Sequence, residues 1–314
     1  MLNYTLKRLG LAVVIASMAM SLLFCMIYLI PGDPAAVALG PRATEAMRDA
    51  LHIKMGLDQP VWVQFRNFFI AAWSGDLGRE VLSDRPVLQV VMEQLPHTLI
   101  LIAGGIGWSV ALGIPLGAWA ALKRGSLWDR IVGILSVSVI AIPSFVIAVY
   151  ALLVFAVFLR WLPAIGAGEP GDITDQAMHL ILPSLAVGLG WVGYLARMVR
   201  ASMLEVLEAP HIRTARAFGL PEGLITYRYA LGIAILPTVT LLGVGIGQML
   251  TSAVFAEIVF ARPGVGKLVY DAILTRNYPL VTGGVLITTV LFVLINLLAD
   301  LIVGALDPRV RRRF

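Results

Sequence analysis

The feature that most constrains this chain is a series of long apolar stretches that contain no Asp, Glu, Lys or Arg. A helix needs about 20 mostly apolar residues to cross the ~30 Å hydrocarbon layer of a bilayer. Six stretches meet that length: residues 9–30, 98–122, 131–159, 177–196, 229–256 and 277–299. We therefore expect an all-α integral membrane protein with six transmembrane helices.

The composition supports lipid, rather than an internal core, as the solvent for these stretches. Apolar residues make up 59% of the 314 positions and charged residues only 14%. Soluble domains are about 45–50% apolar and about 25% charged. A single core could not bury this excess of apolar side chains.

The distribution of basic residues orients the helices. With the N-terminus inside, the cytoplasmic segments hold 14 of the 24 Lys and Arg residues but only 6 of the 19 acids. Such an excess is typical of cytoplasmic loops, so we expect both termini to be cytoplasmic. The predicted division is 1–30 for the N-terminus and first transmembrane helix, 31–97 for a sizeable extracytoplasmic loop region, 98–306 for five further helices, and 307–314 for a basic cytoplasmic tail.

Within the first outer loop, aromatic side chains recur at helical spacing. They are Trp62, Phe65, Phe69 and Trp73, and polar residues lie between them. This stripe favours a helix that lies flat at the membrane surface with its rings at headgroup depth. A core helix of a small external domain is the alternative.

The predicted spans lack the side chains that drive transport or catalysis. Ion-coupled carriers usually place ionisable residues at mid-membrane depth, and none of the six spans has a charge near its centre. This absence argues against an ion-coupled secondary transporter, which is the alternative function from another class of protein. The sequence has no His-Glu-x-x-His pair, Gly-x-Ser-x-Gly elbow or carboxylate cluster, so we expect no enzymatic activity, no metal site and no cofactor.

Small residues and prolines indicate helices that pack closely and bend. The pairs Gly113–Gly117 and Gly243–Gly247 have the spacing that lets two membrane helices approach. Pro115, Pro143 and Pro237 lie within predicted spans, and each removes one backbone hydrogen bond. A translocation path is one explanation for these prolines, and routine kinks are the other.

The cytoplasmic loop 198–228 is the most informative segment. Pro210 interrupts the preceding helix, a short helix over 212–218 follows, and Gly219 can close that helix as a left-handed cap. Pro221 then suits the first position of the next helix. Exposed Ala and Phe side chains beside Arg213 and Arg216 would fit a groove on another protein. A loop that merely joins two spans is the alternative.

These residues resemble a known family. The segment 212–220, Ile-Arg-Thr-Ala-Arg-Ala-Phe-Gly-Leu, followed by Leu236-Pro237, is similar to the cytoplasmic "EAA" loop of binding-protein-dependent ABC importer permeases, in their dipeptide/oligopeptide/nickel branch. Segments 30–35, 56–60, 256–266, 277–281 and 307–311 resemble the same branch in the same order. The chain departs from the general pattern at Arg213, where Glu is usual, and at Phe218, where Lys is frequent.

The resemblance implies a type I ABC importer permease fold and a multi-pass protein of the bacterial inner membrane. It also implies four kinds of partner: a homologous second permease subunit, two ATP-binding cassette subunits that bind the ATP, an extracytoplasmic solute-binding protein, and membrane lipid. No nucleic acid is expected.

The resemblance further implies an ATPase-coupling loop, in which we expect Ala215 to face an ATPase subunit. The loop residues are Ile212, Arg213, Thr214, Ala215, Arg216, Ala217, Phe218, Gly219, Leu220 and Pro221. Peptides are the first choice of solute, and nickel or glutathione are the alternatives. The resemblance assigns no substrate-binding residue.

Overall fold

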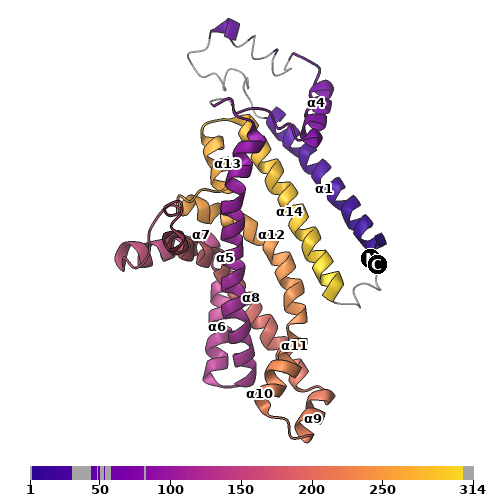
Figure 1. Ribbon diagram of the computed structural model, residues 1–314, viewed down its shortest axis with the longest axis vertical. Coiled ribbons are helices and arrows are strands. Elements are labelled where there is room, and N and C mark those ends of the chain that lie inside the picture. Colours follow the sequence, from indigo (N-terminus) through magenta and orange to yellow (C-terminus); the bar gives the residue numbers. More distant parts are fainter. Residues whose placement is uncertain are drawn as a thin grey trace. The chain divides into compact units, whose positions relative to one another are not determined.

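The computed structural model is helical throughout its described elements (Figure 1). It describes residues 2–29, 44–47, 49, 53, 58–80 and 83–306; most of the segment 30–57 and the tail 307–314 lie outside this range. The helices are α1 (Leu2–Leu29), α4 (Val61–Ser74), α5 (Val87–Leu122), α6 (Leu127–Ala141), α7 (Ser144–Ala151), η1 (Leu152–Phe158), α8 (Ile173–Leu207), α9 (Pro210–Ala217), α10 (Glu222–Leu224), η2 (Ile225–Ala230), α11 (Leu231–Ala234), α12 (Leu236–Val259), α13 (Val265–Leu274) and α14 (Tyr278–Leu306).

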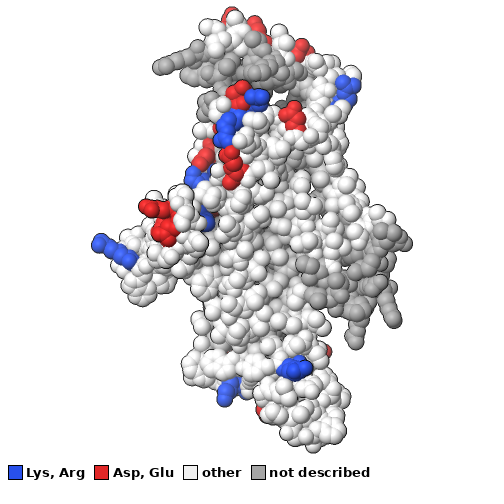
Figure 2. All heavy atoms as spheres, viewed as in Figure 1, with Lys and Arg blue, Asp and Glu red and all other residues white. Residues whose placement is uncertain are grey.

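The six predicted spans correspond to four long apolar helices and two bent pairs. Helices α1, α5, α8 and α14 are each long and apolar enough to cross a membrane. The third predicted span is broken into α6 and α7–η1, which meet at 103°, and the fifth bends by 40° before α12. In the view of Figure 2, the surface over the middle of the helices is almost free of charged side chains. The all-α membrane architecture is thus confirmed, but the third span is not one straight helix.

The three prolines named from the sequence behave differently. Pro115 lies inside the unbroken helix α5, whereas Pro143 has the extended backbone (φ −58°, ψ 142°) from which α7 starts in its new direction. Pro237 occupies the first turn of α12, where its missing N–H leaves no carbonyl unsatisfied. Of these three prolines, only Pro143 and Pro237 coincide with a bend. Both lie where a new helix begins, a position at which proline costs no backbone hydrogen bond.

The chain divides into two compact units, which are described separately. The first combines Thr98–Pro263 with the end of α14 from Ile295, and the second combines Leu2–His97 with Gly264–Leu294. In the first unit, α8 is the central helix and packs against α6, α7 and α12. The Nε1 of Trp108 on α5 donates to the Oγ of Ser184 on α8 over 3.1 Å, and the Oγ of Ser109 donates to the carbonyl of Gly188 over 3.0 Å.

Glycines allow α5 and α8 to approach at backbone distance. A Cβ on Gly113 would lie 2.8 Å from the Cβ of Leu195 and 3.0 Å from the carbonyl oxygen of Val192. A Cβ on Gly117 would overlap the carbonyl oxygen of Ala196. In lipid, where apolar burial supplies little driving force, such close van der Waals packing holds helices together. The packing role predicted for this glycine pair is therefore present in the structure.

The second unit contains α4 and the aromatic stripe. No residue of α4 is buried, and its Phe65 ring meets Phe24 of α1 edge-on at 5.3 Å between centroids. Phe68, which lies outside the predicted stripe, also contacts Phe24 at 5.7 Å. The position of α4 at the membrane surface stays a prediction.

Replacing Gly117 by Val is expected to destabilise the protein, because the new side chain would overlap the α8 backbone and force the two helices apart. Overpacking of this kind typically costs about 1–3 kcal/mol. Gly107→Val is the matched control, since it lies on the same helix and a Cβ there meets nothing within 4 Å. Thermal unfolding in detergent should show a lower Tm for Gly117→Val only; equal Tm values would contradict the packing account.

Candidate coupling site on the cytoplasmic loop

The loop between α8 and α12 folds onto the ends of the neighbouring helices. Ile212 and Ala215 of α9 belong to one buried cluster with Val199 and Met203 of α8. Ala118 and Ala121 at the end of α5, and Ile225, Ala230 and Ala234 beyond α9, complete the cluster. The loop is therefore a packed extension of the helical unit, visible as α9 and α10 at one end of α8 in Figure 1.

Helix α9 ends close to where its sequence predicts but begins earlier, at Pro210 and not at residue 212. Pro210 occupies the first turn, where the proline nitrogen needs no partner. At the other end Gly219 is left-handed (φ +73°). Its N–H donates to the carbonyl of Arg216 over 2.9 Å, and the N–H of Leu220 donates to that of Ala215 over 3.3 Å. These two bonds form a Schellman motif, which satisfies the last helical carbonyls and turns the chain sharply.

The two faces of α9 differ in their partners. Ile212 is fully buried, and Ala215, one helical turn later, is only 7% exposed. Arg213, Thr214, Ala217 and Phe218 point outward, and Phe218 is 82% exposed. A large aromatic ring held at the end of a fixed helix is suited to contact with another protein.

The expectation that Ala215 faces a partner is not supported by this geometry. Residues three apart lie on the same side of a helix, so Ala215 shares the inward face of Ile212 and packs on the span ends. The sequence alone could not choose between the small residues Ala215 and Ala217. The buried cluster makes that choice and leaves Ala217 on the outer face.

A bidentate ion pair stiffens the turn after α9. The Nε of Arg216 donates to Oε1 of Glu222 over 2.8 Å, and Nη2 donates to Oε2 over 3.3 Å. Hydrogen bonding to the Glu222 carboxylate raises the pKa of Arg216, although both side chains remain largely exposed. Arg213, by contrast, makes no ion pair with any residue that the structure describes, which leaves its charge available at the surface.

Comparison with known proteins identifies the family. Residues 113–312 match the binding-protein-dependent transport system inner membrane component, and residues 1–102 match its N-terminal region. The glutathione transport system permease protein GsiC of Pectobacterium atrosepticum is 37% identical over 311 residues, covering 99% of both chains. The chain belongs to the family of binding-protein-dependent inner-membrane permeases. The permease of the same name in Salmonella typhi is 36% identical over 312 residues, again covering 99% of both chains.

The fold of this permease is shared with a solved importer. The MetNI methionine ABC transporter in an inward-facing conformation matches with a TM-score of 0.54 and 21% sequence identity, over 70% of this chain and 97% of that one. This likeness confirms the expected type I permease fold. The family assignment likewise confirms a multi-pass permease of the bacterial inner membrane that works with an ATPase and a solute-binding protein.

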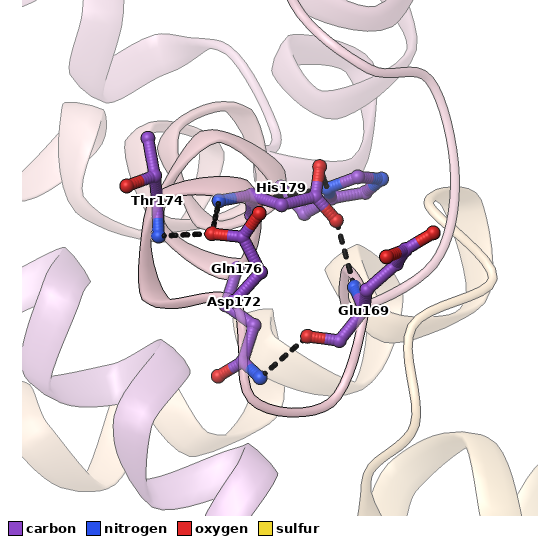
Figure 3. Close-up of polar contacts among 6 residues, drawn as sticks. Glu169, Asp172, Thr174, Gln176 and His179 are labelled. Atoms are coloured by element: carbon purple, nitrogen blue, oxygen red, sulfur yellow. Dashed lines mark hydrogen bonds and ion pairs between the residues drawn. The ribbon is translucent and has the colours of Figure 1, made fainter.

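At the other end of α8, hydrogen bonds fix the loop that precedes the permease's fourth span (Figure 3). Asp172 caps the helix by accepting from the backbone N–H groups of Thr174 and Asp175, at 2.9 and 3.1 Å. The Oδ2 of Asp175 accepts from the N–H of Glu169 over 2.7 Å, and Nε2 of Gln176 donates to the Glu169 carbonyl over 2.9 Å. These hydrogen bonds attach the loop around Glu169 to the first turn of α8, on the predicted extracytoplasmic side.

Two buried polar residues near the outer end of α12 were not singled out from the sequence. The Oγ1 of Thr98 donates to Oε1 of Glu257 over 2.6 Å, although 159 positions separate them. Arg262 is almost fully buried, and its Nε and Nη1 have no hydrogen-bond partner among the described residues. Burial lowers the pKa of Arg262, and the charge of Glu257 opposes that shift. The sequence could not predict the Thr98–Glu257 bond, because neither residue belongs to a motif and they lie far apart along the chain.

Substituting Gly219 tests whether the shape of the loop matters for docking. A Cβ at Gly219 would meet nothing within 4 Å, so any effect must come from the left-handed backbone. A β-branched Val resists it at a cost of about 1–2 kcal/mol, or roughly a tenfold loss of the docked loop. Asn tolerates the same backbone and serves as the control.

We therefore expect Gly219→Val to lower the amount of ATPase subunit that co-purifies with the permease, and Gly219→Asn to retain it. Normal co-purification of both variants would show that the cap is dispensable.

Proposed function

We propose that this permease forms one membrane half of an ATP-driven importer for short peptides, glutathione among them. The observation that carries the proposal is the 35–37% identity to permeases named for glutathione transport, over 99% of both lengths. The aligned region includes both the spans and the cytoplasmic loop. Glutathione is itself a tripeptide, so this solute lies within the peptide class expected from the sequence.

The proposed assembly divides the work among subunits. A homologous second permease would complete the pathway, two ATP-binding cassette subunits would bind and hydrolyse ATP, and a solute-binding protein would deliver the peptide outside. The permease itself would then need no cofactor. The binding protein would bind to outer segments of the permease, among them the hydrogen-bonded loop around Asp172 and residues 257–279.

In this proposal, α9 is the coupling helix. Its inward residues Ile212 and Ala215 attach it to α5 and α8, and its outward residues Ala217 and Phe218 would enter a groove of an ATPase subunit. Burying a Phe side chain contributes about 1.5–3 kcal/mol, a sizeable part of a helix-in-groove contact. Closure of the ATPases on ATP would then move α9, α8 and the span ends together, exchanging inward and outward openings by domain movement.

Reconstitution in proteoliposomes tests the proposed function. With the second permease, the ATPases and the binding protein present, labelled glutathione should accumulate only when ATP is supplied on the cytoplasmic side. Uptake driven by an imposed ion gradient without ATP would instead indicate a secondary transporter. Accumulation of nickel but not of glutathione or dipeptides would overturn the peptide assignment while leaving the ATP-driven mechanism in place.

Cysteine crosslinking tests the orientation of α9. In a variant whose single native cysteine is replaced (Cys25→Ser), Ala217→Cys should crosslink to an ATPase subunit, since residue 217 is exposed on the outer face. Ala215→Cys is the matched control on the same helix, and its burial should prevent the reaction.

Crosslinks from both positions would contradict the orientation, because they would require α9 to leave the buried cluster. Crosslinks from neither position would argue against docking of this loop.

A further inference from the structure

A second ionic contact at the cytoplasmic end involves residues outside the coupling loop. Asp129, in the first turn of α6, and Arg200, on α8, are 71 positions apart in sequence. The Nε of Arg200 donates to Oδ1 of Asp129 over 2.5 Å, and Nη2 donates to Oδ2 over 2.8 Å. Two parallel bonds between a guanidinium and a carboxylate fix the orientation as well as the distance of the pair.

The carboxylate of this pair is also fixed on its own side. Oδ2 of Asp129 accepts from the N–H of Gly125 over 3.0 Å, and the N–H of Asp129 donates to Oγ of Ser126 over 3.3 Å. Ser126 caps α6, so a negative charge in the first turn also faces the positive end of the helix dipole. The side chain of Asp129 is only 7% exposed and that of Arg200 is 34% exposed, so solvent screening weakens this pair less than a fully exposed surface pair.

The position of Arg200 connects this contact to the coupling helix. Its neighbour Val199 and Met203, one turn further along, both lie in the buried cluster that holds Ile212 and Ala215. The stretch of α8 that carries Arg200 therefore packs directly on α9. The Asp129–Arg200 pair joins this stretch to the first turn of α6, the helix that ends at the bend before α7.

We infer that Asp129 and Arg200 are a positioning pair that transmits movement of the coupling helix to α6. This inference rests on the proposed function. The pair makes the first turn of α6 follow α8, so the energy of ATP closure reaches the bent span. Without the pair, the cytoplasmic end of α6 would no longer move together with α8. Less solute would then be imported for each ATP hydrolysed.

A neighbouring ion pair provides a matched control. The Nη1 of Arg124 lies 2.7 Å from Oε1 of Glu208 and joins the same α5–α6 turn to the end of α8. These side chains are 64% and 67% exposed, and such surface pairs contribute little. Losing this pair should therefore leave coupling intact.

The experiment measures the ratio of glutathione imported to ATP hydrolysed in proteoliposomes that contain equal amounts of assembled complex. We expect Asp129→Asn to lower this ratio roughly five- to tenfold, the range of a moderate coupling energy. Arg200→Lys, which keeps the charge but loses the fork, should give a smaller loss, and Glu208→Gln should match the wild type. A wild-type ratio in Asp129→Asn, or an equal loss in Glu208→Gln, would overturn the inference.

A distance measurement separates this inference from the proposed function. In a Cys25→Ser background, spin labels at Leu127 on α6 and Ala217 on α9, both exposed, should keep one narrow distance distribution with and without ATP. Asp129→Asn should broaden it, and an unchanged distribution would contradict the inference.

A wild-type complex that imports no glutathione would refute the proposed function, and the distances would still decide the role of the pair. If Asp129→Asn fails to assemble, Arg200→Lys decides by the same two readouts.

Discussion

The close approach of α5 and α8 is the contact on which the cytoplasmic architecture depends. Inside a bilayer, helices gain little from burying apolar surface, so they associate by packing and by interhelical hydrogen bonds. Gly113 and Gly117 bring the two backbones together, and Ser109 adds a hydrogen bond to the carbonyl of Gly188. The last turns of both helices then form a platform of small and apolar side chains.

This platform explains how a short helix can have a fixed orientation. An eight-residue helix is marginal in water on its own. Helix α9 is held by Ile212 and Ala215 in the buried cluster, by proline at its start and by a Schellman motif at its end. Because these constraints act on one face and at both ends, the opposite face can remain exposed. The exposed Phe218 is thus presented by a helix of fixed orientation, which suits the docking to an ATPase subunit that we propose.

Much of this arrangement could be predicted from the sequence. Uncharged stretches predicted the number of spans, and glycine spacing predicted the close helix contact, because both follow from the absence of water in lipid. Gly219 predicted the end of α9, because glycine adopts the left-handed backbone without steric cost. The start was predicted less well, since Pro210 is itself the first residue of the helix. These features depend on local chemistry, which is readable along the chain.

Other features depend on contacts between distant segments. The break at Pro143 turns the third span by 103°, yet Pro115 in a similar apolar context leaves α5 unbroken. The inward face of α9 is set by its packing on α5 and α8, so the sequence could not exclude Ala215 as a contact residue. The Asp129–Arg200 pair likewise joins two helices, α6 and α8, at positions 71 residues apart in the sequence.

In the mechanism that we propose, the outward face of α9 receives the force of the ATPase. A cryo-electron microscopy structure of the assembled transporter would reveal whether it does. We expect the ring of Phe218 to lie buried in a groove of an ATPase subunit while Ile212 stays packed on α8. A complex in which Phe218 faces solvent, and another segment of this chain contacts the ATPase, would contradict it.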